Sequence, residues 1–106
     1  MILSFSTKEL RDTCQQLERA DAAYGAKQAQ ALFSVLAEVD AAETAEDLQA
    51  LHADNIVVAE DSLSIAFAPQ CRAHFKAVPQ AASDTIVSWS IVRRLKLVQV
   101  EVGANA

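Results

Sequence analysis

An alternating stretch at residues 62–78 constrains the fold of this chain more than any other feature. Apolar and small side chains alternate over residues 62–68, which is the period of two expected for a half-buried strand. Pro69 and Gln70 predict a turn, and the alternation resumes at Cys71. The stretch is therefore expected to form a β-hairpin. Because an isolated hairpin is marginally stable in water, the rest of the chain must supply further strands and a covering layer.

Amphipathic helices and several short strands in the rest of the chain can supply the covering layer and the further strands. Ser6 and Glu9 have the spacing of a capping box, and Gly25 suits the left-handed position at a helix end. Apolar residues at helical spacing then predict a second helix with Leu36 on its buried face. The predicted elements are, in order, a strand at 1–5, helices at 6–19 and 26–41, a helical turn at 44–51 whose Leu48 and Leu51 fill one end of the core, and strands at 56–58, 85–89 and 92–102.

This order of elements predicts an α+β fold. The N-terminal strand and a hairpin of two helices are expected to pack on one face of an antiparallel sheet, within a single domain spanning residues 1–106. The opposite face of the sheet is then left open to solvent or to a partner.

The last predicted strand changes its apolar phase midway. Leu95 and Leu97 share one parity, whereas Val98, Val100 and Val102 share the other. This change predicts either a β-bulge or a central strand that is buried on both faces.

Composition and charge narrow the class of protein. No apolar run approaches the ~20 residues of a membrane-spanning helix, and two cysteines do not make a disulfide framework, so a cytoplasmic location is expected. The net charge of −5 hides an asymmetry, because residues 1–61 carry four Lys and Arg against twelve Asp and Glu, whereas residues 62–106 carry five against two. Such a division can indicate an anionic partner for the basic half, but solvated acidic helices would produce it equally well.

Basic residues gather on the hairpin and on the last strand. Arg72, His74 and Lys76 alternate with apolar residues, so they are expected to share the open face of the sheet at intervals of about 7 Å. The last strand adds Arg93, Arg94 and Lys96, of which alternation places Arg94 and Lys96 on one face and Arg93 on the opposite one. Cationic groups at this spacing suit phosphodiester binding, and a histidine can move a proton near neutral pH. Basic side chains on exposed strands also protect against aggregation, which is the simpler interpretation.

In the order and spacing of these motifs the chain resembles the RelE/ParE toxin superfamily, and within it the HigB-like plasmid-maintenance killer proteins. Residues 2–5 resemble the opening strand of that family, and residues 36–48 resemble its second helix and the turn that follows. The segment from Cys71 to Phe75 is similar to the family's Trp-Arg-x-x-Phe strand, with Arg72 as its basic residue. The resemblance implies a RelE-like fold.

Three features depart from the family pattern. The turn before the hairpin carries Glu60 and Asp61, where the family has a basic turn with glycine. Cys71 replaces the family's tryptophan, and residues 103–106 provide no tyrosine or histidine for RNA cleavage. Acidic groups beside a scissile phosphate would repel it, which weakens the expectation of catalysis more than that of the fold.

The resemblance implies two alternative functions. In the first, the chain is the toxin of a toxin–antitoxin pair, a ribosome-dependent mRNA endonuclease that binds the ribosome, mRNA and a small helix-turn-helix antitoxin. In the second, it is a catalytically silent relative that keeps the fold as a protein-binding module. No cofactor or metal is expected, because no phosphate-binding loop or metal-ligand spacing is present. The catalytic residues of the first function would be Arg72, His74 and Lys76, and its RNA-binding residues Arg93, Arg94 and Lys96.

Overall fold

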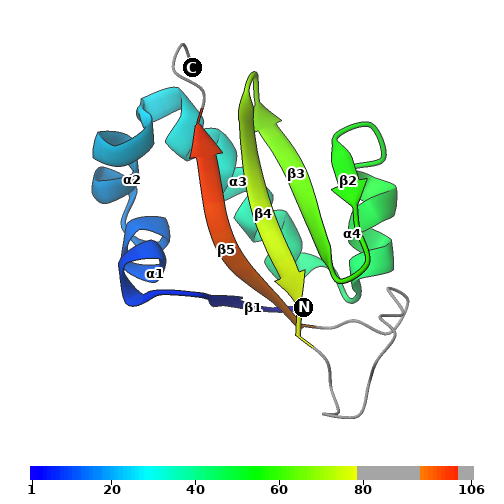
Figure 1. The fold of residues 1–106 in the computed structure, drawn as a ribbon. Helices are drawn as coiled ribbons and strands as arrows, with labels where there is room; N and C mark the ends of the chain where they lie inside the picture. The colour runs from blue at the N-terminus through cyan, green and yellow to red at the C-terminus, as the bar shows by residue number, and fades with distance from the viewer. Residues whose placement is uncertain (79–93, 103–106) are drawn as a thin grey trace.

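A computed structural model describes residues 1–78 and 94–102 of the chain. Its helices lie behind and beside a single sheet, and no described helix or strand covers the other face of that sheet (Figure 1). The α+β class is therefore confirmed. The elements are β1 (Ile2–Phe5), α1 (Lys8–Gln15), α2 (Leu17–Tyr24), α3 (Ala26–Ala41), α4 (Ala45–Leu51), β2 (Ile56–Val58), β3 (Ser62–Ala68), β4 (Cys71–Ala77) and β5 (Arg94–Val102).

The sheet has the strand order β1-β5-β4-β3-β2. Strands β2 to β5 pair in antiparallel fashion, as predicted, whereas β1 is an edge strand that runs parallel to β5. The prediction of a wholly antiparallel sheet with the N-terminal strand packed on its face is therefore wrong, and the sheet is mixed. A parallel pair needs a long crossover connection, and the segment between β1 and β5, which contains α1 to α4 and β2 to β4, provides it. The predicted hairpin is confirmed, with Gln70 of its turn at a φ of 61°. The expected strand at 85–89 and the start of the last strand at 92 lie outside the described residues.

The first predicted helix is wrong as a single element, because the chain breaks it at Gln16. That residue is extended, with φ −124° and ψ 110°, and it separates α1 from α2. Thr7 caps α1 in place of Ser6, since its Oγ1 accepts a hydrogen bond from the Leu10 amide at 3.0 Å. No glycine or proline marks the break, so local sequence signals did not reveal it. Gly25 ends α2 at a φ of 95°, as expected.

The core lies between α3 and the sheet. Leu36 of α3 is buried in one apolar cluster with Phe75 and Leu97. Leu48 of α4 is fully buried, as expected, but Leu51 is 62% exposed, so its predicted place in the core is wrong. Leu51 is the last residue of the seven-residue helix α4, whose buried residues are Ala45 and Leu48.

The phase change in β5 is a β-bulge. Phe75 pairs with Leu97 and His74 pairs with Gln99, so Val98 has no partner on β4. Leu95 and Leu97 are fully buried before this point, and Val98 is 39% exposed at it. One of the two alternatives predicted from the valines is thus confirmed.

Candidate functional site

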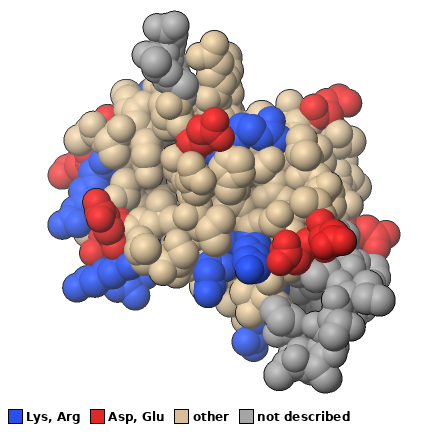
Figure 2. Space-filling model, viewed as in Figure 1, with Lys and Arg blue, Asp and Glu red and all other residues tan. Residues whose placement is uncertain are grey.

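The uncovered face of the sheet, called the open face below, carries the predicted site residues. Alternation along β4 places Arg72, His74 and Lys76 on it, and register places Arg94 and Lys96 beside them on β5. Figure 2 shows this face with a largely uncharged middle, and with basic and acidic side chains toward its two ends. Arg93 lies outside the described residues. The expectation that Arg94 and Lys96 share one face is confirmed.

Arg72 braces the sheet from the open face. Its Nε donates to Ser64 Oγ at 3.0 Å, and its Nη2 lies 3.3 Å from the backbone carbonyl oxygens of both Ser64 and Asn55. These contacts tie β4 to its neighbour β3 and to the residue that precedes β2. The side chain is half-buried, so much of its hydrogen-bonding capacity serves the fold.

His74 and Lys76 also have partners within the chain. His74 Nε2 lies 2.9 Å from Glu101 Oε1, and Lys76 Nζ lies 3.8 Å from Asp61 Oδ2. Such exposed pairs contribute at most about 1 kcal/mol each, so an anion of sufficient charge could displace them. Asp61 belongs to the acidic turn, which therefore sits at the basic end of the open face.

The spacing on β4 limits the chemistry that the three residues can perform together. Arg72 and Lys76 are four residues apart on one strand, which separates their backbones by about 13 Å. One phosphate group therefore cannot contact both positions without long side chains converging on it. Arg72 instead turns toward Ser64. The structure thus aligns the predicted catalytic residues on one face but does not gather them around one point.

A group of neighbouring cations lies at the end of the β4–β5 pair away from Arg72. Lys76 and Lys96 are direct register partners, and Lys96 also neighbours Ser4 of β1. Arg94 follows on the same face of β5. Neither Arg94 nor Lys96 forms an ion pair within residues 1–78 and 94–102. This basic corner, formed by Lys76, Arg94 and Lys96, is the part of the open face best suited to an anion.

A shallow hollow of about 300 Å³ occupies the middle of the open face. Val57, which is 59% exposed, lines it from β2, while Val98 and Gln99 line it from the bulge. Ser64 of β3 and His74 of β4 line the part of the hollow that lies between β2 and β5. Sequence reasoning did not assign Val57, Val98 or Gln99 to a site. The phase change in β5 was the one signal for the bulge that brings the last two residues here.

Neither cysteine forms a disulfide, and both are buried. The described residues contain no cluster of three or more His, Cys, Asp or Glu that could hold a metal ion. Among the helices that the structure describes, none is long and apolar enough to cross a membrane. Comparison with protein-family models, with curated proteins and with solved structures found no match.

Alkaline conditions are expected to destabilise the protein through Cys14. Burial raises the pKa of its thiol from 9.0 to about 11, so the folded state favours the protonated form. The resulting stability is fully present below pH 9 and is lost as the pH rises to about 11. This loss amounts to at most about 2 kcal/mol of the free energy of unfolding. Urea unfolding at about pH 8.5 and about pH 11 measures the free energy of unfolding on the two sides of this range. Between these pH values, Cys14→Ala should lose less of that free energy than the wild type does. An equal loss in both proteins would contradict this assignment.

Proposed function

We propose that this chain is a catalytically silent, RelE-like protein-binding module that presents the open face of its sheet to a protein partner. The observation that carries the proposal is the engagement of the predicted catalytic residues within the fold. Arg72 ties β4 to β3 and to Asn55, the residue before β2, and His74 and Lys76 each pair with a carboxylate. The Arg72 guanidinium, which is bonded to Ser64 and Asn55, is poorly placed to stabilise the charge that develops on a scissile phosphate.

The middle of the open face supports protein binding in a second way. It offers a hollow with exposed valine side chains and few charges, and the surrounding rim is polar. An apolar centre with a polar rim is typical of protein interfaces, whereas nucleic-acid interfaces are strongly positive. The family resemblance makes a small helix-turn-helix protein the first partner to test.

A matched pair of substitutions tests this proposal. Val57 on the open face and Leu51 on the helical side are both apolar and similarly exposed, at 59% and 62%. The partner to coexpress is a small helix-turn-helix protein sought in the reading frames next to the gene, and we expect Val57→Glu to abolish its copurification. Leu51→Glu should leave copurification intact. Equal loss in both variants, or binding unaffected by Val57→Glu, would contradict the open face as the interface.

The second candidate is the toxin, a ribosome-dependent mRNA endonuclease. The basic corner favours it, because Lys76 and Lys96 lie side by side on one face with Arg94 near them. These cations could bind the backbone of an mRNA even though Arg72 is engaged elsewhere.

Expression of the chain without a partner separates the two functions. The binding module should leave growth and translated mRNA unaffected, whereas the toxin should arrest growth and cleave that mRNA. If arrest occurs, Lys96→Ala should relieve it, because this side chain makes no ion pair within the described residues. Harmless expression of a folded protein, with translated mRNA intact, would exclude the second candidate.

A further inference from the structure

A groove opens where β1 ends and β5 continues with a partner strand on its β4 side only. The last register pair joins Phe5 to Leu97, and the Ser6 amide then donates to the Leu97 carbonyl at 3.0 Å. Beyond this point β5 runs on to Val102, and α1 and α2 stand beside it in place of a strand (Figure 1). The space between them has a volume of about 380 Å³.

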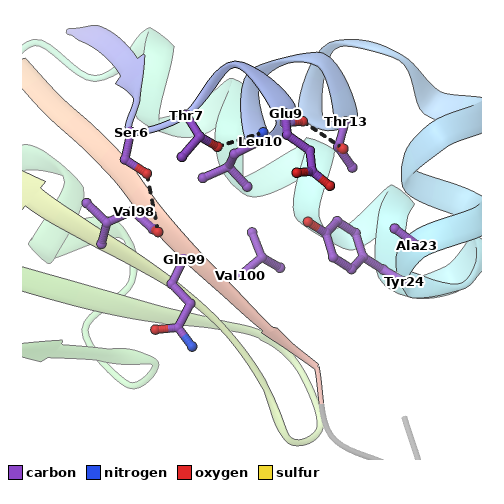
Figure 3. Close-up of a pocket in the computed structure, with 10 residues that line it drawn as sticks. All are labelled: Ser6, Thr7, Glu9, Leu10, Thr13, Ala23, Tyr24, Val98, Gln99 and Val100. Atoms are coloured by element: carbon purple, nitrogen blue, oxygen red, sulfur yellow. Dashed lines mark hydrogen bonds between the residues drawn. The ribbon is translucent and has the colours of Figure 1, made fainter.

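The groove has an apolar side and a polar side. Leu10, Ala23 and Val100 supply aliphatic surface from α1, α2 and β5. Glu9 and Tyr24 project into the same space from the two helices, as Figure 3 shows. A ligand in the groove would thus meet hydrocarbon, an aromatic ring and a carboxylate together.

Most hydroxyl groups around the groove already serve the backbone. Thr13 Oγ1 donates to the Glu9 carbonyl at 2.9 Å, and Thr7 Oγ1 accepts from the Leu10 amide. The Glu9 carboxylate and the Tyr24 phenol, by contrast, have no hydrogen bond or ion pair within the described residues. These two groups are the ones left to bind a ligand.

The electrostatic character of the groove is negative. Among the residues that the structure describes, no lysine, arginine or histidine lines it. Burial raises the pKa of the Tyr24 phenol, and the charges of Cys14 and Glu9 raise that pKa further. Glu9 and Tyr24 line the same groove, and Figure 3 shows both side chains directed into it, so both can contact one ligand. An anion would be repelled here and a cation attracted.

We propose that this groove binds a small organic cation, namely an ammonium or guanidinium group on a short aliphatic chain. The charged group lies between the Glu9 carboxylate and the Tyr24 ring, where a charge-assisted hydrogen bond and a cation–π contact can form together. The aliphatic chain lies against Leu10 and Val100. A volume of about 380 Å³ is in the range of small-molecule sites. This inference does not depend on the function proposed for the open face.

Two probes that differ in charge test the proposal. Butylguanidinium and its neutral counterpart butylurea are titrated separately into ¹⁵N-labelled protein while amide shifts are recorded. We expect butylguanidinium to shift the amides of Glu9, Tyr24 and Val100, and butylurea to bind at least about fivefold more weakly. Added NaCl should weaken the binding of butylguanidinium. Equal binding of the two probes, or no shifts at these residues, would overturn the proposal.

Matched variants identify the side chains that bind the cation. Glu9→Gln should weaken butylguanidinium binding about threefold to fivefold, and Tyr24→Leu should weaken it by a similar factor. Glu46→Gln is the control, because Glu46 also lies in the first turn of a helix but is not part of the groove. It should bind as the wild type does. Unchanged binding by Glu9→Gln, with its amide spectrum showing a folded protein, would overturn the assignment.

A second pair of probes distinguishes the sources of the cation. N-acetyl-arginine amide carries the same group on a peptide backbone, and N-acetyl-citrulline amide is its neutral counterpart. Binding of butylguanidinium alone identifies the ligand as a free amine or guanidine, whereas binding of both cations admits a basic side chain of a peptide. Both outcomes support a cation site. Failure of both cations to bind would overturn it.

Discussion

Replacing Leu36 by alanine is expected to lower the free energy of unfolding by about 2–5 kcal/mol. The side chain is 7% exposed and lies on the face of α3 that packs on the sheet, in the cluster that contains Phe75. Its removal leaves a cavity between two layers that can close only in part, so the transfer and cavity terms add. Equilibrium unfolding in urea, followed by circular dichroism, measures the change.

Leu51→Ala is the matched control for this experiment. Leu51 is also a helical leucine, but it is 62% exposed, so its truncation should change the free energy of unfolding by no more than about 0.5 kcal/mol. A loss below about 0.5 kcal/mol for Leu36→Ala would place that residue outside the core and contradict the packing of α3 on the sheet.

Replacing Arg72 by alanine is expected to cost about 1–3 kcal/mol of stability. The guanidinium group satisfies the hydroxyl of Ser64, which is only 9% exposed, and it also bonds to the Asn55 carbonyl. Without it, Ser64 loses a partner and the link from β4 toward β2 is broken. Alternation predicts the position of Arg72 on the open face, but it does not reveal these hydrogen bonds.

A double-mutant cycle with Ser64→Ala measures the contribution of this contact. The two single changes and the double change should be non-additive by at least about 0.5 kcal/mol, because the residues share one hydrogen bond. Lys76→Ala is the control, since its ion pair with Asp61 is exposed on both sides and contributes little. Additive effects at Arg72 and Ser64 would show that the brace does not stabilise the sheet. Any effect of Arg72→Ala on activity must be interpreted together with this loss of stability.

The elements of this fold were predictable where one strong local pattern specified them. The hairpin at 62–77 follows from alternation and a Pro-Gln turn, and α3 has the predicted bounds 26–41. Even the bulge in β5 was expected as one of two alternatives, because an inserted residue reverses the parity of every apolar residue after it. In each case the signal and the structure lie within the same few residues.

Other features depend on residues far apart in the sequence, and no local pattern could supply them. The break at Gln16 has no glycine or proline, and the parallel pairing of β1 depends on a strand about 90 residues away. The faces of Arg72, His74 and Lys76 were predictable from alternation, but their partners were not. Asn55, Glu101 and Asp61 come from three other segments of the chain. The groove at Glu9 and Tyr24 was missed because three separate elements form it.

The position of β5 has a consequence for how the chain folds. This strand lies between β1 and β4, so the N-terminal strand reaches the rest of the sheet only through it. Because β5 is the last of the five strands to be synthesised, β1 emerges from the ribosome with no strand to pair with. The pairing then closes a loop of about 90 residues, an entropic cost that slows folding relative to a helical domain of this size. Until that step, the hairpin and α3 must hold the nascent chain together, and the apolar side chains of β1 remain exposed to aggregation or to chaperones.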